Sequence, residues 1–439
     1  MIKEWAEHQF ELEKYKTGFS TELVAGATTF ATMAYVLAVV PGMMKGAGLS
    51  PGAVLTAMVL MIFITTMAMA FYTNRPFVLA PGLGSVAIFS ITMVQLQQIP
   101  VEIAAGLVFL SGLLFLAVTL LGIRDAVVSV IPRGIKISIS AGVGLFIAAI
   151  GLRNAHIIAA DAKKTALSFG DLSQPAVWTA AAGMILLLVL QSRHVKGGAL
   201  LAILGGTLLG IPLGVTHFPQ TFFSVPEGVG SIFMRFDIMG ALSLQYVPYL
   251  FAFFLPDFFS SLGTALGVGG RAGFLDSNGD LPGLHKIFLV DSLAAMVGSF
   301  LTIPVLITYL ESSAGVESGG RTGLTAAAAA VLFLLVLAVT PLALMIPAAA
   351  TSPVLIYVGV SMMKGLKNLN YEELSEYVPA FLCIALSVFT FNVGNGIAAA
   401  FIAYVIIRLA QGEYRSLKAG HYLLALVLSY YFYALAFLK

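Results

Sequence analysis

Residues 302–315 read TIPVLITYLESSAG, an apolar stretch that is interrupted by proline and carries the carboxylate of Glu311. Residues 80–85, APGLGS, interrupt a second apolar stretch in the same way. Proline lacks an amide donor and glycine is a poor helix former, so each stretch is predicted to begin as extended backbone and become helical near its middle. In lipid such backbone is tolerated only where protein or a wet cavity surrounds it. The two stretches therefore predict facing half-helices inside a membrane protein; two simple proline kinks are the alternative.

The composition supports a membrane protein. Of the 439 residues, 59% are hydrophobic and 10% are charged, whereas a soluble domain has about a quarter charged residues. A helix of about 20 residues crosses the hydrocarbon core. Reading the apolar stretches between turn signals predicts an all-α integral membrane fold of about fourteen segments, at 21–40, 51–72, 77–97, 101–121, 132–151, 175–191, 195–214, 245–268, 284–301, 303–317, 322–340, 347–364, 377–392 and 394–411.

The ends of the chain and its basic residues predict an orientation. Residues 1–20 lack the basic start and cleavage site of a signal peptide and are predicted to be an amphipathic cytoplasmic segment. With the N-terminus inside, 18 of the 23 Lys and Arg residues fall on the cytoplasmic side of the cell inner (plasma) membrane. The basic residues on the cytoplasmic side include Arg124, Arg133, Arg193, Lys196, Arg271, Lys286 and Arg321.

The C-terminal tail, 412–439, contains the apolar residues 422–438. They form either a fifteenth span or an interfacial helix, and we expect the interfacial helix.

An internal repeat is predicted from the similar ends of two segments. The fifth begins with Ile131-Pro132 and closes with GLRN at 151–154, while the twelfth begins with Ile346-Pro347 and closes with GLKN at 365–368. A repeat of seven segments explains the match, with 21–214 as the first copy, 245–411 as the second and 215–244 as the connecting loop. Because seven is odd, the second copy enters the membrane from the opposite side. Coincidence between two apolar helices is the alternative.

Two acidic residues lie well inside apolar segments. An ionised carboxylate at mid-membrane costs about 2.5 to 3.5 kcal/mol or more, so Glu311 is predicted to face the interior and to bind a solute or a proton. The alternative is that it caps the half-helix or pairs with a neighbouring helix. Asp257 is either a second such ligand or a partner of a neighbouring helix or of the backbone freed by Pro256. The half-helix starts, near residues 83–86 and 309–312, would offer free amides. Three acids nearer the predicted span ends are expected to be solvated or to cap helices, namely Glu22, Glu102 and Asp291.

Several function classes find no support in the sequence. A net charge of +2 without a basic field argues against nucleic-acid binding. The lone Cys383 allows no internal disulfide or cysteine metal cluster, and we assign it no role. No histidine cluster, HExxH, GxSxG or Walker sequence occurs, so neither metal, cofactor nor catalytic residue is predicted. A channel would need a continuous polar face, and an enzyme would need a partner for Glu311 beyond Asp257. A solute transporter is the prediction.

Three motifs resemble one known family. They are ATTFATMAY at 27–35, APGLG at 80–84 and YLESSAGVESGGRTGLT at 309–325, and together they resemble the AzgA-like purine permeases of the nucleobase/ascorbate transporter superfamily. The likeness runs from about Thr17 to Gly412. It implies two inverted repeats, a core and a gate domain, an elevator mechanism, a homodimer and proton-coupled uptake of hypoxanthine, guanine or adenine. The site implied by the resemblance comprises Thr28, Phe30, Ser85, Val86, Ser260, Thr264, Leu310, Glu311 and Ser312.

The departures from the family pattern concern the substrate. The family usually has an aspartate in segment eight where this chain has Ser260, and it tends to have asparagine where Val40 and Val86 stand. Asp257, three residues from Ser260, shares its helix face but sits about 4.5 Å away along the axis. A site with fewer acceptors would suit an N-alkylated purine or another neutral planar heterocycle, the first alternative substrate. An anion transporter on the same architecture is the second, although Glu311 would repel an anion unless protonated.

Overall fold

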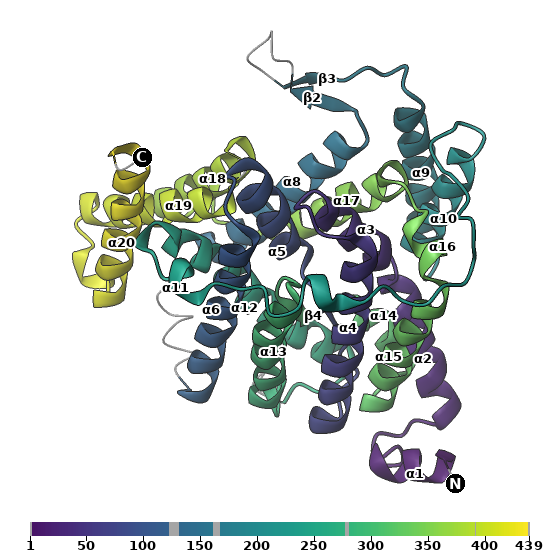
Figure 1. Ribbon diagram of the computed structural model, residues 1–439. Helices are drawn as coiled ribbons and strands as arrows, with labels where there is room; N and C mark the ends of the chain where they lie inside the picture. The colour runs from purple at the N-terminus through teal and green to yellow at the C-terminus, as the bar shows by residue number, and fades with distance from the viewer. Residues whose placement is uncertain (1, 123–130, 161–166, 277–280, 391, 438–439) are drawn as a thin grey trace.

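A computed structural model describes residues 2–122, 131–160, 167–276, 281–390 and 392–437 (Figure 1). Arg124, among the basic residues predicted to be cytoplasmic, lies outside the described residues. The helices pack as two bodies, which we call the core and the gate. The core comprises α2 (Phe19–Met33), α3 (Val36–Lys45), α4 (Pro51–Thr73), β1 (Leu79–Pro81), α5 (Leu83–Ala87), η1 (Ile88–Leu96), α6 (Val101–Leu120), α12 (Val247–Arg271), α13 (Leu284–Gly298), η4 (Ser299–Leu301), β4 (Leu306–Thr308), α14 (Ser312–Glu317), α15 (Gly323–Leu335), η5 (Val336–Val339) and α16 (Thr340–Leu344).

The gate is built from segments five to seven and twelve to fourteen of the predicted series. Its helices lie across the top of Figure 1, above the upright core helices α4, α6 and α13. They are α8 (Arg133–Asn154), α9 (Pro175–Ser192), α10 (Gly198–Gly210), α17 (Ala348–Met362), η6 (Met363–Asn368), α18 (Leu374–Phe389) and α19 (Val393–Ala410).

The remaining elements precede, connect or follow these bodies. The largest is the C-terminal helix α20, which packs on α19, where the Tyr431 hydroxyl donates to Asn395 Oδ1 at 2.6 Å. Whether α20 crosses the membrane or lies at its interface stays a prediction. These elements are α1 (Ile2–Gln9), β2 (Ile158–Ala160), β3 (Leu167–Phe169), η2 (Val229–Ser231), α11 (Ile238–Ala241), η3 (Leu244–Tyr246), η7 (Tyr414–Ser416) and α20 (Ala419–Phe437).

Both interrupted segments are broken as predicted. The third runs as strand β1, the short helix α5 and the π-helix η1, while the tenth runs as strand β4 and the six-residue helix α14. The two strands pair antiparallel, with Leu79 opposite Thr308 and Pro81 opposite Leu306. Each strand thus satisfies the backbone of the other, which a bilayer cannot do. The alternative of two simple proline kinks is wrong.

The helix lengths agree with a multi-pass membrane protein. Ten described helices are long and apolar enough to cross a bilayer, and three shorter apolar helices span Leu83–Leu96, Gly198–Gly210 and Leu374–Phe389. These thirteen, together with the β4–α14 segment, correspond in order to the stretches predicted from the sequence. The number that crosses the membrane stays a prediction, as do the exact bounds of the two repeats.

The helices whose similar ends predicted a repeat pack against each other. In the gate, α8 and α17 cross at Gly144 and Gly359, where a side chain on either glycine would overlap the carbonyl oxygen of the other. The two positions are separated by about 215 residues, the offset between the matching ends of the fifth and twelfth segments. A reciprocal contact between equivalent residues is what a twofold axis produces. This contact supports the repeat over the alternative of coincidence.

Glu22 caps a helix, one of the roles expected for it. Its carboxylate is fully buried and accepts the backbone N–H of Arg321 at 2.9 Å and that of Thr325 at 3.2 Å. The Thr325 hydroxyl also donates to it at 2.6 Å. Backbone amides at the start of a helix have no partner within the helix. Glu22 on α2 therefore satisfies the start of α15 and joins the first and eleventh segments of the core.

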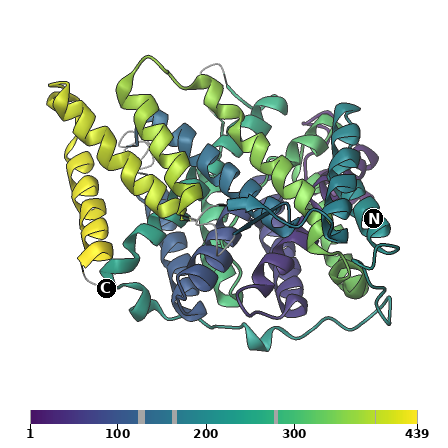
Figure 2. The same ribbon diagram turned by 90° about the horizontal axis from the view of Figure 1, so that it is seen from above.

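The connecting loop runs along one edge of the molecule, and its second half is fastened to the core (Figure 2). Arg235 forms an ion pair with Glu102 at the start of α6. The Ser50 hydroxyl donates to Glu227 at 2.7 Å, and the Thr302 hydroxyl donates to the carbonyl of Ile232 at 2.7 Å. These contacts fasten the connecting loop from residue 227 onward to the core body.

Candidate functional site

Glu311 stands at the end of the extended half of segment ten, directly before α14. It is half-buried, and its Oε1 accepts a hydrogen bond of 2.7 Å from the hydroxyl of Tyr35. Tyr35 is 3% exposed and lies in the two-residue turn between α2 and α3. Tyr309, two residues before Glu311, donates its own hydroxyl to the carbonyl of Pro81 in β1. A carboxylate is thus held where the first, third and tenth segments meet.

Asp257 lies on α12 and contacts another predicted site residue. Its Oδ1 accepts from the hydroxyl of Ser85 on α5 at 2.7 Å. Its Oδ2 is buried without a hydrogen-bond partner among the described residues. The alternative role for Asp257, a partner of a neighbouring helix, is therefore seen, while one carboxylate oxygen is left for another ligand.

The role predicted for Asp291 from the sequence is wrong. This residue was expected to be solvated or to cap a helix, but it is 0% exposed in the middle of α13, where the Thr308 hydroxyl of β4 donates to its Oδ2 at 3.2 Å. Its Oδ1 is buried beside the equally buried hydroxyl of Ser261, and neither atom makes a hydrogen bond of ordinary length among the described residues. The expectation failed because distance from a predicted span end does not show which helix face meets β4.

One face of α12 is lined by small residues and is not covered by protein. Ser260, Gly263 and Gly267 are exposed along this face, and no other side chain approaches the space beside Gly263 within 4 Å. Leu310, next to Glu311, is 53% exposed and reaches toward Gly267. A face in contact with lipid would carry large apolar side chains, as transmembrane helices do. We interpret this face as one wall of a solute cavity beside Glu311.

The gate lies across from this wall. Lys136 of α8 places its ammonium 5.5 Å from the centre of the Phe259 ring, which neighbours Ser260. Farther along α8, Val143 packs so close to Gly84, at the start of α5, that a side chain on Gly84 would overlap it. The core and the gate therefore touch at the half-helix of segment three.

The other predicted site residues are engaged within the core. The Ser312 hydroxyl accepts the backbone N–H of Val78 at 3.1 Å, which joins α14 to β1. The Thr28 hydroxyl donates to the carbonyl of Val24 at 2.9 Å, and the Phe30 ring packs edge-on against Phe333 with centroids 4.9 Å apart. Val86 and Thr264 are buried beside Ser85 and Ser260. A substrate role for these residues stays a prediction.

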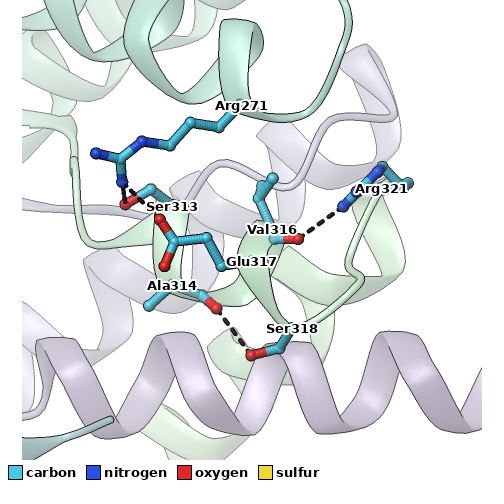
Figure 3. A network of polar contacts seen from close by, with 7 residues as sticks. All are labelled: Arg271, Ser313, Ala314, Val316, Glu317, Ser318 and Arg321. Carbon is cyan, nitrogen blue, oxygen red and sulfur yellow. Dashed lines mark hydrogen bonds and ion pairs between the residues drawn. The ribbon is translucent and has the colours of Figure 1, made fainter. Parts of the chain in front are cut away.

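Cationic side chains hold the far end of α14 (Figure 3). Arg271, the last residue of α12, donates to the Ser313 hydroxyl at 2.8 Å and to Glu317 at 2.9 Å. Arg321 donates to the carbonyls of Val316 and Gly320, each at 2.7 Å. Basic side chains at a helix C-terminus satisfy its free carbonyls and suit its dipole. The half-helix that follows Glu311 is thereby fixed at its far end.

One further cation in this region comes from the gate. Lys196, in the loop between α9 and α10, donates to the hydroxyl of Ser318 at 2.6 Å. Ser318 directly follows α14 and donates in turn to the carbonyl of Ala314 at 2.9 Å (Figure 3). This contact links the gate to the segment that carries Glu311.

The sequence did not reveal two of the residues that shape the site, Tyr35 and Asp291. Tyr35 closes the motif ATTFATMAY, but nothing in its spacing shows that its hydroxyl reaches a residue 276 positions away. Across the described ranges no group of three His, Cys, Asp or Glu side chains is placed to hold a metal ion. This region presents carboxylate and hydroxyl oxygens beside a wall of small residues, a combination that suits a small solute with N–H donors.

Comparison with known proteins identifies the family. The model of the Permease family, Xan_ur_permease, matches residues 20–412. The chain belongs to this nucleobase/ascorbate permease family. The permease is 37% identical to the adenine permease AdeQ of Escherichia coli, over 93% of this chain and 92% of that protein. It is 36% identical to the guanine/hypoxanthine permease PbuO of Bacillus subtilis, over 93% of this chain and 96% of that protein.

A solved structure shows the same fold. The transmembrane domain of the cyanobacterial bicarbonate transporter BicA superposes with a TM-score of 0.64 at 17% identity, over 87% of this chain and 96% of that domain. The predicted inverted-repeat fold with broken third and tenth segments is thus confirmed. The permease is a multi-pass membrane transporter and not an enzyme.

Cysteine accessibility tests the proposed cavity wall of this permease. Gly263→Cys places a thiol on the uncovered face of α12, whereas Ser261→Cys places one on the buried face of the same turn. The native Cys383 is 0% exposed and should contribute little background. We expect a membrane-impermeant maleimide to label Gly263→Cys much faster than Ser261→Cys. Equal, slow labelling of both would show that the face is not open to water.

Proposed function

We propose that this protein is a secondary active transporter that takes up a purine nucleobase, namely hypoxanthine, guanine or adenine, together with protons. The observation that carries the proposal is the carboxylate of Glu311, held by Tyr35 through one oxygen and set beside the uncovered face of α12. Its other oxygen, Oε2, is taken by no other side chain among the described residues. Ring N–H groups of a flat heterocycle are suitable donors to it. The adenine and guanine/hypoxanthine permeases among the relatives support this substrate class.

The serine at position 260 motivates a second substrate class. Ser260 is exposed on the proposed cavity wall, at the position where the resemblance implies an aspartate. A hydroxyl accepts fewer ring N–H groups than a carboxylate does. An unpaired buried donor costs about 1 to 3 kcal/mol, so a purine with fewer N–H groups loses less in this site. N-alkylated purines and other neutral planar heterocycles are therefore the alternative substrates.

An anion is a weaker candidate substrate on the same fold. The likeness to a bicarbonate transporter concerns the fold alone, at 17% identity. Glu311 and Asp257 place negative charge at the site, and like charges repel unless a proton neutralises one of them. Electroneutral uptake that rises with the charge of an anion would favour this candidate over a purine.

Glu311 and Asp257 are the candidate proton carriers. Each lies inside the core, and one of its carboxylate oxygens accepts a hydrogen bond from a neighbouring hydroxyl. The donor is Tyr35 for Glu311 and Ser85 for Asp257. Carboxylates inside a membrane protein are costly and mark solute or proton pathways. A carboxyl group that binds a proton on one side of the membrane and releases it on the other couples the two fluxes.

We further propose that the core moves against the gate as an elevator, with the protein in a homodimer and its N-terminus in the cytoplasm. Two observations support this motion. The helices pack as two bodies, and the two broken segments pair with each other inside the core. The contacts between Lys196 and Ser318 and between Gly84 and Val143 would have to break as the core moves.

Substrate competition tests the proposed substrate class. Purified protein in proteoliposomes should take up radiolabelled hypoxanthine or adenine, and unlabelled purines should compete. If Ser260 favours a purine with fewer ring N–H groups, a methylated xanthine competes at least as well as hypoxanthine. Failure of every purine to bind or compete would overturn both substrate classes at once.

An imposed pH gradient tests the coupling. Proteoliposomes that are more acidic outside should accumulate substrate, and Glu311→Gln should bind poorly or fail to transport because the carboxylate is lost. Glu317→Gln is a matched control, since Glu317 lies two turns away and its pairing with Arg271 is more than half exposed, worth about 0 to 1 kcal/mol. Normal accumulation by Glu311→Gln would remove this residue from the mechanism.

Cross-linking tests the elevator. In a Cys383→Ala background, a short bismaleimide should join Lys196→Cys to Ser318→Cys, fix the gate to the core and stop transport while substrate binding remains. The control pair, Glu102→Cys with Arg235→Cys, lies wholly within the core body and should transport normally after cross-linking. Undiminished transport by the cross-linked first pair would rule out relative motion at this contact.

A further inference from the structure

Tyr35 occupies a break in the first segment. Helix α2 ends at Met33 and α3 begins at Val36, so Tyr35 sits in the turn between them. Its side chain is 3% exposed, and its hydroxyl donates to Glu311 Oε1 at 2.7 Å. A buried phenol is usually placed so that its hydroxyl finds a partner, and here that partner is the carboxylate of the proposed site.

The hydrogen bond restricts how Glu311 can point. A glutamate side chain has three rotatable bonds, and ordering it when a ligand binds costs affinity. Tyr35 fixes Oε1 before any ligand arrives and leaves Oε2 as the oxygen without a side-chain partner among the described residues. Tyr309 does not compete for this role, since its hydroxyl is committed to the carbonyl of Pro81.

The two ends of the Glu311 segment are therefore fixed by different groups. Arg271 and Arg321 hold the far end of α14, while Tyr35 holds the carboxylate itself. Helix α14 also packs along α2, the helix that leads into the turn of Tyr35. A shift in the break of the first segment would thus move the carboxylate relative to the cavity wall.

We propose that Tyr35 is a positioning residue, which presents Glu311 Oε2 to a ring N–H of the substrate and ties the break of the first segment to the site. This inference rests on the proposed function, because it takes Glu311 as the substrate ligand. Tyr35 itself acts through Glu311 and need not touch the substrate.

Removing the hydroxyl tests the proposal. For Tyr35→Phe, purified and in lipid nanodiscs, we expect the dissociation constants of radiolabelled adenine and hypoxanthine to rise about two- to tenfold, the range set by ordering one long side chain. The maximal transport rate, measured in proteoliposomes, should stay within about twofold of the wild-type rate, since the loss falls on binding. The matched control is Tyr431→Phe, which removes another buried tyrosine hydroxyl, hydrogen-bonded to Asn395, from α20. It should leave both quantities unchanged.

A double-mutant cycle on melting temperature separates positioning from a general structural role. Glu311→Met keeps the side-chain length but removes the acceptor, so Tyr35→Phe should lower the melting temperature less in this background than in the wild type. Equal losses in both backgrounds, or an unchanged dissociation constant in Tyr35→Phe, would overturn the proposal. If the wild type binds no purine, the proposed function fails; if it binds and Tyr35→Phe binds equally well, this inference alone fails.

Discussion

The antiparallel pairing of β1 with β4 is the constraint on which the rest of the structure depends. Two extended segments in the interior of a membrane protein expose amides and carbonyls that lipid cannot satisfy. Residues 79–81 and 306–308 satisfy them by pairing with each other, and the ladder is extended by bonds from Gly82 to Val305 and from Tyr309 to Val78. Because the partners are 227 positions apart at Ala80 and Ile307, neither half of the core is complete without the other.

The polar groups of the core gather around this strand pair in one recurring arrangement. Three carboxylates near the strand pair each receive a hydroxyl from a neighbouring segment: Glu311 from Tyr35, Asp257 from Ser85 and Asp291 from Thr308. A hydrogen bond to a charged group contributes about 1.5 to 3 kcal/mol, which offsets much of the cost of placing a carboxylate in the membrane. Under the function proposed above, the remaining oxygen of Glu311 and of Asp257 serves a ligand or a proton, so that the same arrangement supports both stability and transport.

The gate depends on a different kind of contact. Its two symmetry-related helices meet backbone to backbone at Gly144 and Gly359, the close approach that small residues allow in membrane helices. Two of the links from gate to core are the hydrogen bond of Lys196 with Ser318 and the close contact of Val143 with Gly84, and α12 also packs against α8 and α19. Under the proposed elevator, the gate stays rigid through this close internal packing while the core moves.

The sequence by itself determined the class of protein, the order of its segments and the two breaks. Apolar length, proline and glycine are local properties, and local properties decide where a membrane helix can form and where it must stop. Glu311 and Asp257 were also identified from the sequence, because a carboxylate inside an apolar run can be recognised without knowing the fold. The motif at 309–325 added the family, which the comparison confirmed.

Only the tertiary structure decided which groups meet. That Tyr35 reaches Glu311, that Asp291 is buried against Thr308 and that Glu22 caps α15 all depend on contacts between distant segments. Asp291 was misjudged because its distance from a span end does not reveal which helix face meets the strand pair. The uncovered face of α12 is likewise a result of packing, since Ser260, Gly263 and Gly267 are distinguished from their buried neighbours only by what stands opposite them.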